Sequence, residues 1–148
     1  MLHQWLELHN ALTRAMDDHR TLCGAIEADP VAISQVRWQI SKISRERTAW
    51  MLNVVNPTAE RLAHTSGGAA WLAVQATTPA YRQQISAFVS RWPNDAIIRD
   101  WSGYRQSAAE LGKMIRPRLR TEEIAIRALA AERDAPLARV LPPIRQVI

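Results

Sequence analysis

Five polar side chains stand on stripes of the sequence that are otherwise apolar at helical spacing. They are His9, His19, Arg47, Arg118 and Glu122. A charged group on a buried helix face is costly unless it is paired or reaches water, so each of these residues needs a partner. A guanidinium satisfies a carboxylate through parallel N–H donors and binds small anions in the same way. We therefore take these residues as candidates for an inner polar network or for a site that holds a small anionic ligand.

Arg118 and Glu122 are four residues apart, so they lie on one face of a helix and can form an ion pair. If the helix that carries Arg47 is a neighbour, a second guanidinium reaches the same carboxylate. Alternatively, Pro117 kinks the helix and leaves Arg118 and Glu122 at its rim, with the arginines extending into water. The sequence leaves both arrangements open.

A second candidate is a run of four basic residues within eight positions: Lys113, Arg116, Arg118 and Arg120. Residues 1–74 carry seven basic and seven acidic side chains and residues 75–148 carry twelve and seven, so the net charge of +5 belongs to the second half. A local basic patch attracts phosphates, which makes nucleic-acid binding the alternative function. The simpler interpretation of the run is a solvated helix face.

Metal and catalytic chemistry have little support. His19 and Cys23 are four residues apart, but a structural zinc site needs four ligands and a free cysteine is commonly just buried. Gly67 and Gly68 are not followed by the lysine of a phosphate-binding loop. Because no full set of catalytic roles can be assigned, we expect neither an enzyme nor a bound metal or cofactor.

We expect helices to position these residues, because the alternation of apolar and polar residues that is typical of strands is nowhere sustained in the sequence. The 148 residues suit one domain, with helices predicted over 2–28, 30–55, 79–92 and 94–132, and an earlier start of the third helix is left open. Asp29-Pro30 and Thr78-Pro79 each pair an N-cap acceptor with a proline in the first turn, so both are predicted helix starts. Pro117 is expected to kink the last helix, and the apolar stretch 69–76 cannot be typed by periodicity.

The predicted domain covers residues 1–134, followed by a proline-interrupted apolar tail over 135–148 that we expect to lie against the helices or a partner. Tryptophans on the stripes are expected in the core: Trp5, Trp50, Trp92 and Trp101. Trp38 and Trp71 lie off the stripes and are better suited to a dimer surface or a ligand groove. A homodimer is therefore expected.

The sequence has no apolar run long enough to span a bilayer, and its first residues lack the features of a secretion signal. Its single cysteine, Cys23, fits a reducing compartment. We therefore expect a cytoplasmic protein with no membrane association.

The pattern resembles the hemerythrin-like, or HHE-type, cation-binding domain over most of the chain. Asp18-His19-Arg20-Thr21-Leu22 is similar to the DHxxL ligand motif of the family's first helix. The predicted helix over 30–55, with its I-x-x-I-x-x-x-R ladder before a proline, resembles the second helix, and residues 118–123 resemble the H-x-x-x-E-E segment of the last. The resemblance implies an up-down four-helix bundle.

The same resemblance implies that most metal ligands are missing. His19 and Glu122 match ligand positions, but Arg47 and Arg118 occupy two histidine positions and Met51 occupies that of a glutamate. A di-iron site needs several imidazoles and bridging carboxylates around one cavity. We therefore expect a metal-free relative that acts as a binding or regulatory module, with a small anion near Arg47, Arg118 and His19.

Overall fold

The computed structural model describes residues 1–135, in which all regular structure is helical and no strand occurs. The predicted all-α class is therefore confirmed. The helices are α1 (Leu2–Cys23), α2 (Pro30–Trp50), α3 (Asn56–Arg61), α4 (Ser66–Arg91), α5 (Asn94–Arg99) and α6 (Trp101–Arg133), with a π-helical segment at Met51–Val55 between α2 and α3. The tail beyond residue 135 lies outside the described residues, as do the expectations placed on it.

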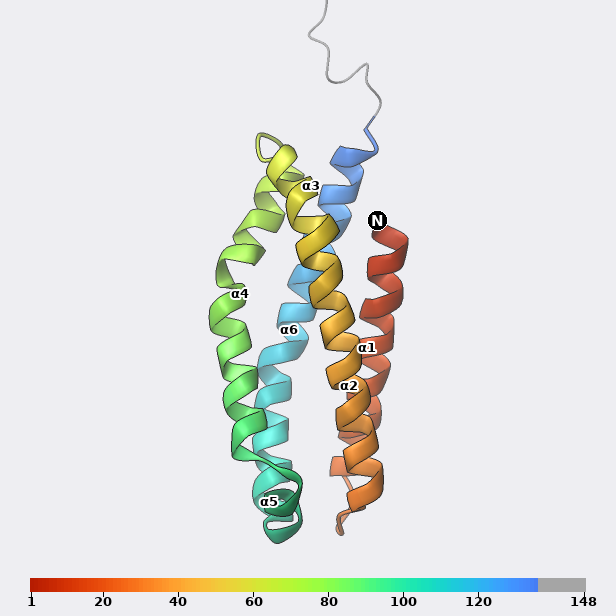
Figure 1. The fold of residues 1–148 in the computed structure, drawn as a ribbon, viewed down its shortest axis with the longest axis vertical. Coiled ribbons are helices and arrows are strands. Elements are labelled where there is room, and N and C mark those ends of the chain that lie inside the picture. The colour runs from red at the N-terminus through yellow and green to blue at the C-terminus, as the bar shows by residue number, and fades with distance from the viewer. Residues whose placement is uncertain (136–148) are drawn as a thin grey trace, which may run out of the picture.

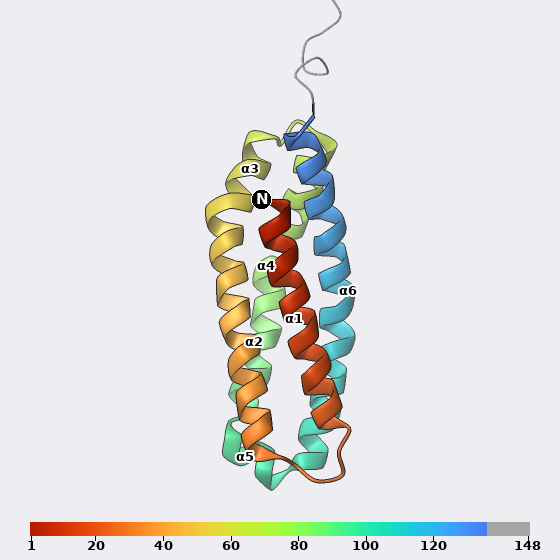
Figure 2. The ribbon, with the colours of Figure 1, turned by 90° about the vertical axis from the view of Figure 1, so that its right-hand side faces the viewer.

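The helices α1, α2, α4 and α6 lie side by side along the long axis, with α3 near one end and α5 at the other (Figure 1). The turned view shows α1 between α2 and α6 (Figure 2). The backbones pack most closely in the pairs α4 with α6 and α1 with α2, and α1 also lies against α6. The helices α2 and α4 are not a closely packed pair.

The predicted start of α2 is confirmed. Asp29 has an extended backbone and its carboxylate accepts from the Ala32 amide at 3.1 Å, with Pro30 in the first turn. The preceding helix is shorter than predicted, because α1 ends at Cys23 and residues 24–28 form the connection.

The predicted helix start at Pro79 is wrong, because α4 runs from Ser66 to Arg91 and contains this proline. The Thr78 hydroxyl donates to the Val74 carbonyl one turn back, at 3.1 Å, instead of capping a new helix. The N-cap is Thr65, whose hydroxyl accepts from the Gly68 amide at 3.0 Å. The ambiguous stretch 69–76 is thus helical.

Two further boundaries differ from the prediction. The helical path continues beyond residue 55, through the π-helical segment into α3, with Pro57 in the first turn of that helix. The predicted helix over 94–132 is divided at Asp100, whose carboxylate caps α6 by accepting from the Gly103 amide at 2.9 Å. Helix α6 then continues through Pro117.

The core of residues 1–135 consists of three clusters along the long axis. The cluster near α3 includes Trp5 and Trp71, whose rings meet edge to face at 5.4 Å. A middle cluster is made by Leu12, Ala15, Ile43 and Leu119. The cluster near α5 contains Ile33, Trp92, Ile97 and Tyr104. The described part of the middle cluster draws on α1, α2 and α6 but on no residue of α4.

The two tryptophans assigned to a surface behave differently. Trp38 is 61% exposed, as expected of a side chain off the stripe. Trp71 is 0% exposed, and its indole N–H donates to Asn56 Oδ1 at 2.8 Å, so the expectation that it lies on a surface is wrong. The longer helix α4 explains the error, because its stripe begins well before Pro79 and includes Trp71.

Candidate anion-binding site

Arg47 lies on the inner face of α2 and is 8% exposed. Its Nη2 donates to Glu122 Oε2 on α6 at 2.7 Å. Its guanidinium carbon lies 4.6 Å from the ring centre of Trp5, which is a cation–π distance. One arginine therefore joins α2 to both α1 and α6.

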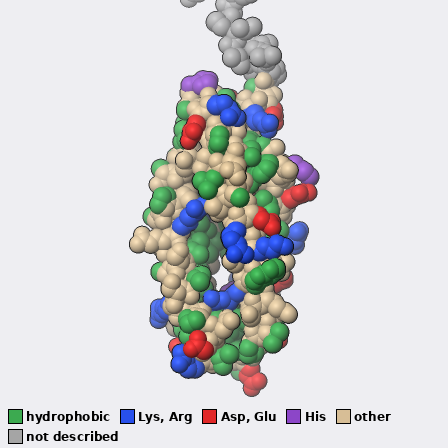
Figure 3. Space-filling view, viewed as in Figure 1, with side chains coloured by type: hydrophobic (Ala, Val, Ile, Leu, Met, Phe, Trp, Pro, Cys, Tyr) green, Lys and Arg blue, Asp and Glu red, His purple; other side chains and the backbone are tan. Residues whose placement is uncertain are grey.

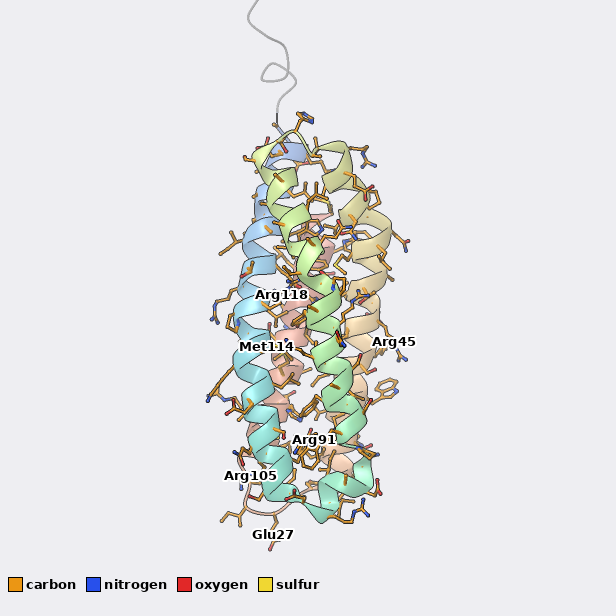
Figure 4. All side chains as sticks on the ribbon, turned by 90° about the vertical axis from the view of Figure 1, so that its left-hand side faces the viewer. Glu27, Arg45, Arg91, Arg105, Met114 and Arg118 are labelled. Carbon is orange, nitrogen blue, oxygen red and sulfur yellow. The ribbon has the colours of Figure 1, made fainter. Side chains whose placement is uncertain are left out.

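Arg118 approaches the same carboxylate from within α6. Its Nε donates to Glu122 Oε1 at 3.0 Å, and its Nη2 donates to the Val74 carbonyl at 3.0 Å and to the Thr78 hydroxyl at 2.8 Å. Nη1 donates to Thr77, and the guanidinium lies 5.0 Å from the ring centre of Tyr81. Figure 4 shows Arg118 between α6 and α4. The structure thus brings Arg47, Arg118 and Glu122 together, with no more than 12% of any of their side chains exposed.

The charges in this group do not balance. Two guanidiniums share the single carboxylate of Glu122, which leaves one positive charge in excess in a poorly hydrated region. Tyr81 supplies no compensating charge, because burial, followed by the Glu122 carboxylate, raises the pKa of its hydroxyl to about 12. An anion placed here would be attracted by a field that the described residues do not neutralise.

Several buried N–H groups at this level have no hydrogen-bond partner among the described residues. They are Arg47 Nε, Trp5 Nε1 and Trp50 Nε1. Trp5 lies beneath the Arg47 guanidinium, and Trp50 follows Arg47 by three positions on α2. Buried donors are normally paired, because an unpaired one keeps the full cost of losing water. These N–H groups are covered by the surrounding side chains, so they add to the cost of burying Arg47.

His9 borders this group from α1, one turn after Trp5. Its side chain is 8% exposed, and its Nε2 lies 3.8 Å from Glu123 Oε2. Burial, followed by repulsion from Arg47, lowers the pKa of its imidazole, so His9 is neutral near pH 7 and adds no second positive charge. Its Nδ1 has no partner within residues 1–135 and adds to the free hydrogen-bonding capacity.

His19 is not part of this group. It lies ten residues beyond His9 on α1, about 15 Å along the helix axis. There its Nε2 is 2.5 Å from the Tyr104 hydroxyl and 3.8 Å from Cys23 Sγ. Burial, followed by Arg37, lowers the pKa of His19 to about 4. The expected joint site of His19, Arg47 and Arg118 is therefore not formed, because His19 lies ten residues along α1 from His9, the residue that borders Arg47.

Arg37 was missed by the sequence analysis. Its guanidinium lies 5.7 Å from the ring centre of Tyr104, and its Nη1 is buried without a partner among residues 1–135. A signal was available in the spacing of Arg37, which lies three residues before Ile40 and ten before Arg47, at the edge of the apolar stripe of α2.

The basic run 113–120 is divided between the inside and the outside. Arg118 points inward, Arg116 pairs with Asp17 at 2.9 Å, and Lys113 lies 3.5 Å from Glu110. Arg120 is exposed and lines a small groove of about 240 Å³ between α1 and α6. The four side chains thus form no single basic surface, and nucleic-acid binding through them stays a prediction.

The residues around Glu122 do not fit the metal centre of the hemerythrin-like family. Guanidiniums occupy both oxygens of Glu122, and Met51 lies in the apolar cluster near α3. Within residues 1–135, no three His, Cys, Asp or Glu side chains are grouped so that they could hold a metal ion. The donor set here suits an anion and not a cation.

The surface of the protein is hollowed beside Arg47, Arg118 and Glu122. Figure 3 shows the hollow between α4 and α2, with Lys and Arg side chains along its borders. The Arg82 guanidinium of α4 reaches across to the Thr48 hydroxyl of α2 at 3.1 Å. Tyr81 and Ile85 stand on the inner stripe of α4, and the apolar clusters of the described residues include neither of them. The helices α2 and α4 thus meet here mainly through long polar side chains, and their backbones do not pack closely.

Comparison with family models, with curated protein sequences and with solved structures finds no match to the chain. Among the helices of residues 1–135, none combines the length and the apolar character that crossing a membrane requires. Interpretation of the site therefore depends on its geometry.

Proposed function

We propose that the protein is a binding module that holds a small anion, such as a carboxylate, on Arg47 in the space between α2 and α4. The observation that supports this most strongly is the excess of guanidinium over carboxylate around Glu122. Arg118 has its donors engaged by Glu122, Val74, Thr77 and Thr78, so its part is to hold Glu122. Arg47 is then the residue that contacts the ligand.

Calorimetric titration with acetate and with inorganic phosphate tests this proposal. Arg47→Gln should weaken binding by at least about tenfold, the size expected from losing one charged hydrogen bond. Arg45→Gln is the matched control, because Arg45 lies two positions earlier and points away from the other helices (Figure 4). Circular dichroism shows whether each variant is folded. Equal binding by both variants, or no binding by the parent chain, contradicts the proposal.

We further propose that the fold is an up-down four-helix bundle of the hemerythrin-like kind, in which the arginine pair replaces the metal centre, and that the protein is cytoplasmic. The side-by-side placement of α1, α2, α4 and α6 supports the first part (Figure 1). Elemental analysis after gentle purification should find no stoichiometric iron, manganese or zinc. Such a metal would overturn this part and revive an enzymatic interpretation.

Self-association is proposed on the basis of Trp38. This side chain lines a groove of about 770 Å³ between α2 and α5 and stands beside other exposed apolar residues, Val31 and Ile98. Sedimentation should show a dimer at tens of micromolar, on the order of concentrations at which weak homodimers form. Trp38→Gln should shift the equilibrium toward monomer, and a parent chain that is already monomeric would contradict the dimer.

A further inference from the structure

We propose that the anion is the head group of a linear, medium-chain carboxylate whose hydrocarbon chain lies between α2 and α4, extending from Arg47 toward Arg37. This inference rests on the proposed function, because it takes Arg47 as the residue that holds the head group. It adds the chemical class of the rest of the ligand and the path along which it lies.

The incomplete core at mid-height supplies the apolar surface for such a chain. The middle cluster is covered from α2 by Ile40 and from α6 by Ile115, whereas α4 contributes nothing to it among the described residues. Opposite it, Tyr81 and Ile85 of α4 are half-buried without joining any cluster of residues 1–135. Two apolar surfaces thus face each other between helices that do not pack closely. A flexible hydrocarbon chain suits such a narrow apolar space.

The two ends of this space differ in polarity from its middle. Arg47, with its unpartnered Nε, lies at one end, and Arg37, with its unpartnered Nη1, lies ten residues earlier on α2, about 15 Å away along the axis. Phe88 and Tyr104 close the lower end, with ring centres 5.8 Å apart. The head group is assigned to Arg47 because two guanidiniums, those of Arg47 and Arg118, meet only the single carboxylate of Glu122 there.

Charge complementarity separates this space from the larger groove between α2 and α5. That groove is lined by apolar and uncharged polar side chains, including Ile33, Trp38, Gln39 and Asn94, and by no ionisable one from the described part of the chain. It can bury apolar surface but cannot select a head group. The space between α2 and α4 offers both, which is why a carboxylate with an apolar chain fits there.

Titration of the full chain with acetate, decanoate and decanol tests the inference. Decanoate should bind at least about a hundredfold more tightly than acetate, the gain expected from burying about four methylene groups. It should also bind more tightly than decanol, which has the same chain without the charge. Ile85→Trp, which fills the space, should weaken decanoate but leave acetate binding unchanged. Ala87→Trp is the control, because Ala87 is exposed on the outer side of α4.

A second measurement needs no variant. Decanoate that carries a nitroxide at its far end should broaden the methyl signals of Ile85 and Ile40 and leave those of Ile98, which is exposed on α5, unchanged. Broadening of Ile98 with sharp Ile85 signals would place the chain in the outer groove and overturn the inference.

The measurements distinguish a failure of the proposed anion binding by Arg47 from a failure of the proposed hydrocarbon path between α2 and α4. If acetate binding depends on Arg47 but decanoate binds no more tightly than acetate, the inference is wrong and the proposed function stands. If decanol equals decanoate and Arg47→Gln has no effect on either, the space takes apolar molecules without a head group, and the proposed function is wrong as well.

Discussion

Arg47 and Glu122, seventy-five residues apart in the chain, form an ion pair of 2.7 Å between α2 and α6 with side chains only 10% and 6% exposed. Neither helix pair α1–α2 nor α4–α6 contains both residues, so this contact ties the two pairs together through the interior. The contribution of this ion pair to the free energy of unfolding therefore shows how far Arg47, Arg118 and Glu122 stabilise the fold.

The costs of replacing the two members of the pair should differ and should not add. Glu122→Leu leaves the Arg47 and Arg118 guanidiniums without their carboxylate, at roughly 3 to 5 kcal/mol, whereas Arg47→Met leaves Glu122 paired with Arg118 and should cost less. The double variant should cost less than the sum, because Arg47 has no ion pair left to lose once Glu122 is replaced. Denaturant titration of the four proteins measures the coupling. Arg99 and Asp95 form an exposed pair and provide the control, for which each replacement should be nearly neutral. Small and additive effects at Arg47 and Glu122 would show that the charges are solvated.

His19 should make stability depend on pH. Its folded pKa of about 4 lies below the ordinary value of 6.5, so the unfolded chain takes up the proton first as the pH falls. The free energy of unfolding should therefore decrease between pH 6.5 and about 4, by on the order of 3 kcal/mol from this residue. His19→Gln removes the titrating group and should flatten that part of the profile. His3→Gln, at a side chain that is 85% exposed, should leave it unchanged.

An NMR titration of His19 provides an independent check. Its ring proton signals should hold their neutral position at pH 6 and move only as the pH approaches 4. A midpoint near 6.5 would mean that the ring is hydrated and that the contact with Tyr104 is not maintained.

The glycines of α4 and α6 should respond to alanine in opposite directions. A Cβ at Gly67 would meet the Ala128 carbonyl of α6, and one at Gly68 would meet the Leu62 carbonyl, so each substitution should destabilise by about 1 to 3 kcal/mol. Gly112 has open space around it, so Gly112→Ala should stabilise by up to about 1 kcal/mol through helix propensity. Thermal unfolding of the three variants measures this. Destabilisation by Gly112→Ala would place another segment against that face of α6.

Cys23 should react slowly with alkylating agents in the folded protein. Burial raises the pKa of its thiol to about 11, which lowers the fraction of reactive thiolate at pH 8 by about a hundredfold relative to a free cysteine. The rate of modification by iodoacetamide, followed by mass spectrometry, should rise sharply when the chain is denatured. Equal rates in the two states would show that the thiol is open to solvent.

Helical periodicity was sufficient to predict that His9, Arg47 and Glu122 face inward, but it did not identify Asn56 or Thr58, which are also buried. The apolar stripes placed Arg47 and Glu122 among residues that the structure buries, because a period of 3.6 determines which side chains face inward wherever the helix is regular. The same reasoning could not separate His19 from Arg47, since it gives the face of a residue but not its height relative to residues on another helix.

The errors arose where local signals compete with tertiary contacts. Thr78-Pro79 has the composition of a helix start, but the chain continues through it because Trp71 and Val74 pack in the core on one side and Arg118 binds the Val74 carbonyl on the other. Arg37 escaped notice because it lies beside the apolar stripe and depends on Tyr104, sixty-seven positions away. Such contacts are not encoded by any short pattern.

The π-helical segment Met51–Val55 has a consequence for how the chain tolerates insertions and deletions. A turn that closes over five residues instead of four holds one residue more than its neighbours, which rotates everything after it by about 100° relative to an uninterrupted α-helix. Because of this rotation, Asn56, the first residue beyond the turn, faces the Trp71 indole. Loss of one residue from this turn would therefore give a regular α-helical turn and leave Asn56 facing Trp71. Asn56 would turn away only if the turn closed as an α-helix with all of its residues kept, so this is a place where the chain tolerates a deletion of one residue.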